Sequence, residues 1–431
     1  MMWKRIPGIK KFFGSLVLFC VSSNLLLLLY YPPKIFDNPC PLVVSWKKSQ
    51  WSQYTRDGLP KSINCSFIYN RNHSSNIPSY KWCYRRDTIT DYHYSKLASN
   101  CSMFLKHRNY NRHQVTSKEK KFPLAFSILM HTNVEQMERM LHAIYRPHNV
   151  YCIHVDAKSA SSIHTAVQAI VKCLPNVFVA SRVIPVHWAE FSVLEAEIIC
   201  LEDLWKYKYW KYYINLAGTE FPLKTNLELV QVLKAYKGGN EIDGSPSHRP
   251  TAWTQYSWKR EYWRTNTLKS PPPHGFTIAK GSTHIVASRE FIDFALHDRK
   301  ALDLINWMKD IRCPDEHFFQ TLNINSHLGV PGAYTGNPDL RDGFYVRYKI
   351  WKSPGTMCHG KWVDFICVLG AGDLHKAVIS KQFFLNKLNL DMDPIAYQCL
   401  EQWYNDRVQK GRNPDFDIGF YMSRKLVNNH I

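Results

Sequence analysis

The sequence is short of acidic residues and lacks closely paired cysteines. It has 35 Asp and Glu residues against 55 Lys and Arg, for a formal net charge of +20. No basic run with interleaved aromatic residues follows a recognisable RNA- or DNA-binding module, which argues against a nucleic-acid partner. The 12 cysteines include no C-x-x-C pair, and Cys358 and Cys367 are spaced too widely for a zinc knuckle. The positive charge therefore indicates a solvated basic surface, or else attraction to anionic ligands or membrane surfaces.

A long run of uncharged residues extends from Phe12 to Tyr31. About 20 residues at helical rise just span a bilayer. Four basic residues precede the run, so the positive-inside rule keeps residues 1–11 in the cytosol and sends the chain after Tyr31 across the membrane. We therefore predict a type II signal-anchor at 12–31. A cleaved signal peptide is the alternative, but its apolar core would be shorter, and the tyrosines and prolines at 30–33 make a poor cleavage site.

Glycosylation motifs and cysteines fit an oxidising lumen. N-x-S/T sequons at Asn64, Asn72 and Asn100 all follow the predicted span, where a luminal chain meets the glycosylation machinery. Cys20 lies in the span, which leaves eleven of the 12 cysteines (12 − 1) for the lumen. An odd number requires at least one free or intermolecular thiol. Cys40 is our candidate for the bridge of a disulfide-linked homodimer.

The order of apolar patterns predicts an α/β fold. Residues 32–121 are polar without sustained periodicity, which predicts a stem followed by a disulfide-tied approach segment. Strand and helix patterns then alternate, which indicates a parallel sheet with helices on both faces. The predicted strands are 124–130, 150–155, 177–180 and 212–216, and the predicted helices are 134–144, 163–171, 191–205 and 227–236. Later residues are less regular, with a candidate strand at 283–286 and a helix at 290–308.

Polar residues follow the predicted strands at the edge where ligands of such sheets bind. His131 follows the first strand, Asp156 ends the second, and the turn at 215–220 ends the fourth. The Asp156 carboxylate can accept hydrogen bonds from a ribose or a uracil imide, or it can cap the following helix. The pattern leaves both interpretations open.

Three further motifs carry weaker signals. The segment 370–373 (GAGD) lacks the third glycine of a dinucleotide-binding loop, so a tight turn capped by Asp373 is favoured. The D-x-D strings at 391–393 and 415–417 come too late in the chain for a metal motif that follows nucleotide-binding strands. Residues 313–319 (CPDEHFF) start a helix. Glu316 there is a capping residue or, if it faces a cleft, a general base.

Four segments together resemble the core 2/I-branching β1,6-N-acetylglucosaminyltransferases. They are 151–156 (YCIHVD), 215–226 (NLAGTEFPLKTN), 313–316 (CPDE) and 368–374 (VLGAGDL), and the likeness extends from about Cys65 to Cys399. The resemblance implies a Rossmann-like GT-A fold in the Golgi lumen, behind one transmembrane helix, that works without a metal or other cofactor. It places the catalytic domain at 122–400 and leaves 401–431 as a C-terminal tail.

The resemblance also implies roles for single residues. Glu316 would be the base that takes the proton of an acceptor 6-hydroxyl as its oxygen attacks the anomeric carbon of UDP-GlcNAc, with inversion. Lys387 would stabilise the leaving diphosphate, since without a metal only protein cations can. The remaining assignments are His131 and Asp156 for the nucleotide, Glu241 for the acceptor galactose, and Arg249 in place of a family lysine.

Disulfide pairs are implied by the same likeness. They are Cys65 with Cys399, Cys101 with Cys173, Cys152 with Cys200, and Cys358 with Cys367. Cys40, Cys83 and Cys313 are then left over.

Two departures from the family pattern put the activity in question. The family has an arginine 23 positions before its lysine, where this chain has Asp364, so a charge beside the diphosphate is reversed; nearby Lys361 is a candidate replacement. The family's Trp-x-Tyr pair corresponds to Tyr348 and Ile350, which changes the acceptor site. We expect β1,6 branching of mucin-type O-glycans on glycoproteins at the Golgi membrane. The alternative is a catalytically impaired pseudoenzyme that binds nucleotide-sugar or glycan there.

Overall fold

The computed structural model describes residues 65–69, 89–110, 115–259, 263–411 and 413–430. These residues all belong to one compact unit. The predicted segments 1–11 and 12–31, most of the predicted stem, the sequons at Asn64 and Asn72, and the cysteines at 20, 40 and 83 lie outside them. Within the described part of the chain, no helix has both the length and the apolar composition that a bilayer crossing requires.

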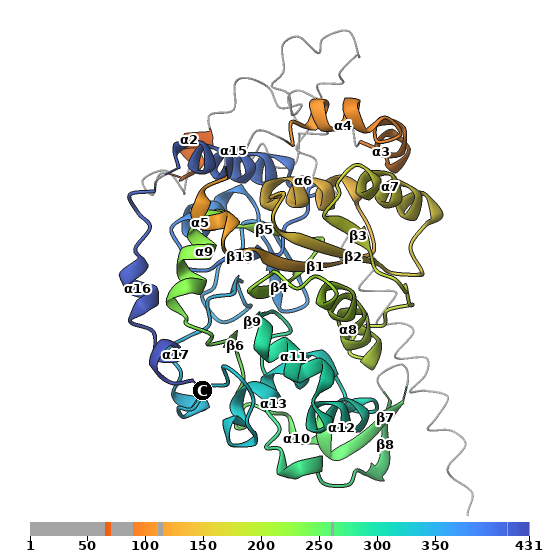
Figure 1. Cartoon of the computed structure of the whole chain (residues 1–431), viewed down its shortest axis with the longest axis vertical. Coiled ribbons are helices and arrows are strands. Elements are labelled where there is room, and N and C mark those ends of the chain that lie inside the picture. The colour runs from red at the N-terminus through yellow and green to blue at the C-terminus, as the bar shows by residue number, and fades with distance from the viewer. Residues whose placement is uncertain (1–64, 70–88, 111–114, 260–262, 412, 431) are drawn as a thin grey trace, which may run out of the picture. The chain divides into compact units, whose positions relative to one another are not determined.

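A six-stranded sheet lies at the centre of this unit (Figure 1). Its strand order is β3-β2-β1-β4-β9-β6. The bounds are β1 (Leu124–Met130), β2 (Val150–Val155), β3 (Val177–Val179), β4 (Tyr212–Ala217), β6 (Glu241–Ile242) and β9 (Ile285–Ser288). The strands β1 to β4 run parallel, whereas β9 runs antiparallel to β4 and β6. The predicted mixed α/β fold with a parallel sheet is therefore confirmed, and β9 begins two residues after the candidate strand start at 283.

Helices cover both faces of this sheet, because alternate strand residues point to opposite faces. Phe126 and Ile128 of β1 join the core formed with α6 (Val134–Ile144), α7 (Ser161–Lys172) and α9 (Asn226–Ala235). Ala125 and Cys152 join the other core with α8 (Phe191–Trp205), α11 (Arg289–His297) and α12 (Arg299–Met308). Figure 1 shows α6 and α7 on one side of the parallel strands and α8 on the other.

The helix predicted at 290–308 is two helices, α11 and α12. Asp298 between them has an extended backbone, and its side chain accepts a hydrogen bond from the Lys300 amide at 2.8 Å. This interaction caps α12 and ends the continuous helix that the apolar spacing predicted.

A second, three-stranded sheet brings late segments beside the end of β4. Its order is β10 (Arg347–Tyr348), β13 (Phe384–Asn386) and β5 (Glu220–Pro222). Strands β10 and β13 pair in parallel, and β13 and β5 pair antiparallel. Two hairpins complete the strands, β7 (Tyr256–Lys259) with β8 (Trp263–Leu268) and β11 (Lys361–Val363) with β12 (Ile366–Val368).

The remaining helices are mostly short. They are α2 (Cys65–Tyr69), α3 (Asp91–Leu97), α4 (Cys101–Arg108), α5 (Ser117–Lys120), α10 (Thr251–Gln255), α13 (Phe318–Ile324), α14 (Leu374–Val378), α15 (Pro394–Lys410), α16 (Ile418–Met422) and α17 (Lys425–Asn428). Single 3-10 turns occur at η4 (Pro273–Gly275), η5 (Pro314–Glu316), η6 (Ser326–Leu328), η7 (Pro338–Leu340) and η8 (Ala371–Asp373).

The C-terminal residues are part of the fold and not a separate tail. The predicted boundary between 400 and 401 falls inside α15. Tyr404, Tyr421 and Leu426 are buried, and the last two belong to the core around α6, α7 and α9. The mixed charge of 401–431 suggested exposure, but its apolar residues pack against elements that lie far away in the sequence.

Three of the four predicted disulfides are present. They join Cys65 to Cys399, Cys101 to Cys173 and Cys358 to Cys367. The predicted bridge between Cys152 and Cys200 is not formed: both are buried thiols, with sulfur atoms 2.6 Å apart, whereas a disulfide bond needs about 2.05 Å. Cys313 is a buried free thiol, in agreement with the prediction.

Candidate active site

Asp156 and His131 lie side by side where β2 and β1 end. The Asp156 amide donates to the Met130 carbonyl at 2.8 Å, and the Ser159 hydroxyl donates to the His131 carbonyl at 2.9 Å. The His131 side chain is exposed. This is the edge that the sequence predicted for a ligand of a parallel sheet.

The Asp156 carboxylate holds a turn and does not cap a helix. It accepts hydrogen bonds from the amides of Lys158 at 2.9 Å and Val186 at 3.3 Å, and Lys158 Nζ lies 3.2 Å from its Oδ2. Burial opposes ionisation, but these donors hold the pKa of Asp156 below its ordinary value. The helix α7 has Ala160 at its N-cap, without a side-chain bond, so the capping interpretation of Asp156 is wrong.

Glu316 ends the turn η5, which starts α13 as predicted. Cys313 precedes the turn with a left-handed backbone (φ 51°), and Pro314 takes the first position, where its missing N–H costs nothing. The Glu316 side chain is 31% exposed, and its Oε2 lies 2.8 Å from Lys280 Nζ. Among the described residues, Oε1 has no hydrogen-bond partner. Glu316 is therefore a carboxylate with one oxygen occupied by a cation and one available.

The segment 280–284 lies directly against Glu316. The Gly281 amide donates to the Glu316 carbonyl at 3.0 Å. A Cβ on Gly281 would come within 2.2 Å of the Asp243 carbonyl oxygen, so only glycine allows this close approach. Asp315 is the second acid here, and burial together with the Glu316 charge raises the pKa of Asp315 to about 7.

A buried charge network lies beyond this segment, centred on Glu220. Its Oε1 lies 2.8 Å from Arg347 Nε and 2.8 Å from His284 Nε2, and it also accepts from the Asn386 side chain. Burial opposes ionisation, yet Arg347 and His284 hold the pKa of Glu220 well below its ordinary value. Burial lowers the pKa of His284 to about 3, so its imidazole is neutral and donates its Nε2–H to Glu220.

Two lysines lie near this network, one after each of the paired strands β10 and β13. Lys349 follows β10, and its Nζ lies 3.1 Å from His284 Nδ1. Lys387 follows β13, and its carbonyl accepts from the Leu369 amide at 2.9 Å. Burial lowers the pKa of Lys349 to about 8, and the charges of both Glu316 and Lys387 act on it. The structure thus brings the predicted residues Glu316 and Lys387 into one electrostatic neighbourhood, with Lys349 within range of both.

Asp364 lies in the two-residue turn between β11 and β12. It is exposed and has a left-handed backbone (φ 53°), a conformation that Asp tolerates better than most residues. The neighbouring Lys361 is exposed as well.

Glu241 lies in the core, so the prediction that it binds the acceptor galactose is wrong. Its side chain is 0% exposed, and its oxygens contact the Tyr236 hydroxyl at 2.8 Å, Arg424 at 3.3 Å and Arg341 at 3.4 Å. Two guanidinium groups and a phenol therefore occupy the carboxylate that was expected to hold an acceptor sugar. This arrangement leaves Glu241 no open oxygen for a ligand.

The other two predicted acceptor residues remain partly exposed. Arg249 donates from Nη1 to the Thr254 hydroxyl at 3.1 Å, and its charge acts on His317, beside Glu316. Burial raises the pKa of Tyr348 to about 12. Tyr348 therefore directly precedes Lys349, and Arg249 lies within electrostatic range of the residue that follows Glu316.

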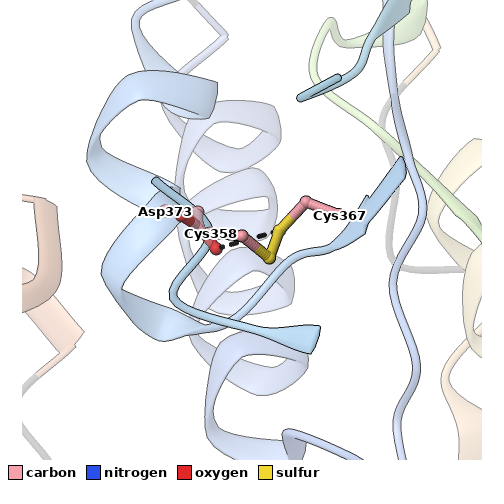
Figure 2. A group of neighbouring side chains, drawn as sticks. All are labelled: Cys358, Cys367 and Asp373. Atoms are coloured by element: carbon pink, nitrogen blue, oxygen red, sulfur yellow. Dashed lines mark hydrogen bonds between the residues drawn. A yellow bond between two sulfur atoms is a disulfide. The ribbon is translucent and has the colours of Figure 1, made fainter. Parts of the chain in front are cut away.

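One group with potential metal ligands occurs among the described residues, and it is structural. Figure 2 shows Cys358 and Cys367 joined by their disulfide, with Asp373 beside them. Bonded sulfurs cannot act as thiolate ligands. The Asp373 carboxylate instead accepts from the Gly370 amide at 2.9 Å and lies 2.8 Å from His359 Nδ1. The predicted tight turn capped by Asp373 is confirmed.

The D-x-D carboxylates also have structural partners. Asp393 caps α15 by accepting from the Ala396 amide, and it accepts from the Ala371 amide, both at 2.9 Å. Asp391 accepts from the Asn133 side chain at 2.9 Å, and Asp417 caps α16.

Sequence reasoning missed Lys280, Lys349 and the network around Glu220. Lys349 stands between Tyr348 and Ile350, within the motif that was compared with the family, so its charge was visible. Its neighbourhood was not, because His284 is 65 positions away and Arg347 is 127 positions from Glu220.

Comparisons with known proteins show the family of this chain. Residues 124–378 match the family model described as "Core-2/I-Branching enzyme". A human beta-1,3-galactosyl-O-glycosyl-glycoprotein beta-1,6-N-acetylglucosaminyltransferase 3 is 35% identical over 384 residues, which cover 82% of this chain and 86% of the relative. A mouse N-acetyllactosaminide beta-1,6-N-acetylglucosaminyl-transferase is 38% identical over 320 residues, 72% of this chain and 79% of the relative. A bovine herpesvirus 4 relative of the first kind is 34% identical over 394 residues, 84% of this chain and 88% of the relative.

The protein is therefore a glycosyltransferase. It belongs to the core-2/I-branching enzyme family, whose matched members are named as beta-1,6-N-acetylglucosaminyltransferases.

Proposed function

We propose that this chain transfers N-acetylglucosamine from UDP-GlcNAc to a 6-hydroxyl of an acceptor glycan, and so branches mucin-type O-glycans of glycoproteins. The observation that carries the proposal is Glu316, a partly exposed carboxylate with one oxygen available; its charge and that of Lys387 both act on Lys349, and neither lysine forms an ion pair among the described residues. The names of the relatives support the donor sugar and the linkage. The GT-A type of the fold and a luminal orientation are parts of the same proposal.

The reaction is a single displacement with inversion. Glu316 Oε1 takes the proton of the acceptor 6-hydroxyl while that oxygen bonds to the anomeric carbon of the donor. The bond between this carbon and the diphosphate breaks, and its electron pair leaves with UDP. Lys387 stabilises the negative charge that develops on the leaving phosphate. His131 and Asp156, at the edge of the sheet, bind the nucleoside.

No metal takes part in the proposed reaction. The carboxylates of the D-x-D strings support this view, because Asp393 and Asp417 cap helices and Asp391 accepts from Asn133. Lysines near Glu316 would supply the positive charge that Mg²⁺ or Mn²⁺ supplies elsewhere. We further propose that Arg249 and Tyr348 bind the acceptor, without Glu241.

We propose the Golgi membrane as the location, with the segment 12–31 as a type II anchor. The three disulfides favour an oxidising compartment. Asn100 caps α4 through an accepting side-chain oxygen and is exposed, so its side-chain nitrogen is available for glycosylation.

A second candidate function is that of a binding protein with little or no turnover. Two observations favour it: Lys280 occupies one oxygen of Glu316, and Asp364 puts a negative charge at the exposed hairpin turn where the family pattern has a positive one. Such a protein would bind UDP-GlcNAc or a glycan but would not release UDP.

The test combines binding with turnover in the presence of a chelator. We expect calorimetry to detect UDP and UDP-GlcNAc binding, and a mass-spectrometric assay to detect GlcNAc on a galactosyl-β1,3-GalNAc acceptor. Glu316→Gln should abolish transfer but keep UDP binding, whereas the matched variant Glu290→Gln, at an exposed helix position, should keep both. Binding without transfer would favour the second function. Full transfer by Glu316→Gln would refute the base assignment.

A further inference from the structure

Lys349 is a partly buried lysine whose hydrogen-bond partners are neutral. Its Nζ lies 3.1 Å from His284 Nδ1 and 3.4 Å from the Ser282 hydroxyl. His284 is neutral and gives its other nitrogen to Glu220 at 2.8 Å, so Nδ1 acts as an acceptor. Among the described residues, Lys349 forms no ion pair. The side chain is thus oriented by neutral groups, including the Trp351 ring, whose centroid lies 5.6 Å from Nζ, and it contacts no carboxylate directly.

The nearby carboxylates are already occupied. Glu220 is paired with Arg347 at 2.8 Å, and Glu316 is paired with Lys280 at 2.8 Å. Of the cations whose charges act on this neighbourhood, Lys349 and Lys387 form no ion pair within the described residues, whereas Arg347 and Lys280 do. A partly buried ammonium without a counter-ion is unfavourable, and two such groups near each other favour a ligand that carries two negative charges.

Strand pairing puts the backbones of these two lysines at neighbouring strand ends, and the charge of Lys387 acts on Lys349. Strands β10 and β13 are parallel, with Tyr348 opposite Leu385, so the chain continues to Lys349 on one side and to Asn386 and Lys387 on the other. From there Lys349 reaches Ser282, one residue from the Gly281 amide that holds the Glu316 carbonyl. Lys349 therefore links the neighbourhood of Lys387 to that of the proposed base.

We propose that Lys349 is the second cation of the donor site and that, with Lys387, it binds the diphosphate of a nucleotide sugar. This inference rests on the proposed function, because that function supplies the diphosphate. When the bond to the anomeric carbon breaks, its electron pair stays on the diphosphate, and the Lys349 ammonium donates a hydrogen bond to the oxygen that gains charge. Lys349 would then stabilise the leaving diphosphate, which is the role that the family pattern gives to an arginine at position 364 in the hairpin turn.

The experiment compares UDP with uridine, because the two ligands differ only in the diphosphate. Calorimetry on the purified full chain in chelator gives both affinities for the wild type, Lys349→Met, Lys349→Arg and the control Lys352→Met, which changes an exposed lysine three positions away. We expect Lys349→Met to weaken UDP about 10- to 100-fold, as for loss of one charge-assisted hydrogen bond, and to leave uridine unchanged. Lys349→Arg should keep most of the UDP affinity, and Lys352→Met all of it.

The pH dependence provides an independent readout. Burial lowers the pKa of Lys349 to about 8, so wild-type UDP affinity should fall as the pH rises from 7 to 9.5, and the Met variant should lose that part of the dependence. The groups that face Lys349 are His284, which is neutral over this range, the paired Glu220 and Arg347, and Glu316 and Lys387.

Four results would overturn the assignment. If the wild type prefers UDP and Lys349→Met keeps the preference, Lys349 is not the second cation. The same conclusion holds if a further variant, Lys361→Met, loses the preference instead. Equal loss of UDP and uridine would mean a structural role, which thermal unfolding of the variant would reveal. If the wild type does not distinguish UDP from uridine, the proposed function itself is wrong and the assignment fails with it.

Discussion

Glu241→Gln distinguishes a carboxylate of the core from a carboxylate of the acceptor site. In the structure Glu241 neutralises Arg424 and Arg341 and accepts from the Tyr236 hydroxyl. Glutamine keeps the size and one accepting oxygen, so the Tyr236 contact can persist. The two buried guanidinium groups lose the negative charge between them.

The expected loss of stability is large for a single substitution. Removing one partner of a buried ion pair costs about 3–5 kcal/mol. Arg424 retains Asp342 at 3.2 Å and the Gly343 carbonyl at 2.8 Å, so we expect the lower end, about 3 kcal/mol. With an unfolding entropy of about 2 cal/mol/K per residue, a domain of this size would lose roughly 4 °C in Tm.

The assay is thermal unfolding of the purified protein with its disulfides intact, together with the acceptor KM. Glu241→Gln should lower Tm and leave KM unchanged in the fraction that is folded, and Glu202→Gln, an exposed control, should change neither. Arg424→Met should destabilise as well, and its effect should not add to that of Glu241→Gln, because the two side chains contact each other. A raised KM with an unchanged Tm would refute the core assignment and restore Glu241 to the acceptor site.

Three further predictions concern single carboxylates. Burial raises the pKa of Glu197 to about 7, so the folded protein loses stability as the pH rises from about 4.5 through 7. The Tm of Glu197→Gln relative to that of the wild type should therefore be higher at pH 8 than at pH 5. An equal difference in Tm at the two pH values would contradict this. Asp393→Ala removes two accepted hydrogen bonds, one of which caps α15, and should cost about 1–3 kcal/mol in denaturant unfolding. If a chelator inhibited transfer by the wild type but not by Asp393→Ala, Asp393 would instead be a metal ligand. Asp364→Arg should raise transfer about 10- to 100-fold in a steady-state assay; no gain would mean that the hairpin turn does not reach the diphosphate.

Much of the fold could be predicted because its signals are local. The apolar runs of β1 and β2 match the strands residue by residue, since a strand buried on both faces needs an unbroken apolar run. The predicted start of a helix after Cys313 also holds, because Pro314 and the acids that follow act on the turn beside them. The helix at 290–308 failed where a local cap, Asp298, outweighed apolar spacing that continued through it.

The candidate site could be predicted only in part. Motif order selected Glu316, Lys387 and Asp156, and the structure puts the first two in one neighbourhood. Their charge environment depends on contacts that no motif contains: Lys280 reaches Glu316 from 36 positions away (316 − 280), and Lys349 reaches His284 from 65. Glu241 shows the opposite case, a motif residue that is buried by Arg424, 183 positions later.

The sequence by itself determined the alternation of strands and helices, the family, and the residue types available for proton transfer and phosphate binding. Periodicity and turn chemistry act over a few residues, so they are readable without a fold. Only the tertiary structure decided which charges are neutralised and which remain open. Glu220 and Arg347 form a buried ion pair, Tyr421 and Leu426 complete the core around α6, α7 and α9, and Lys349 forms no ion pair within the part of the chain that the structure describes. The physical reason is that the energy of a charge depends on burial and on partners brought from distant parts of the chain.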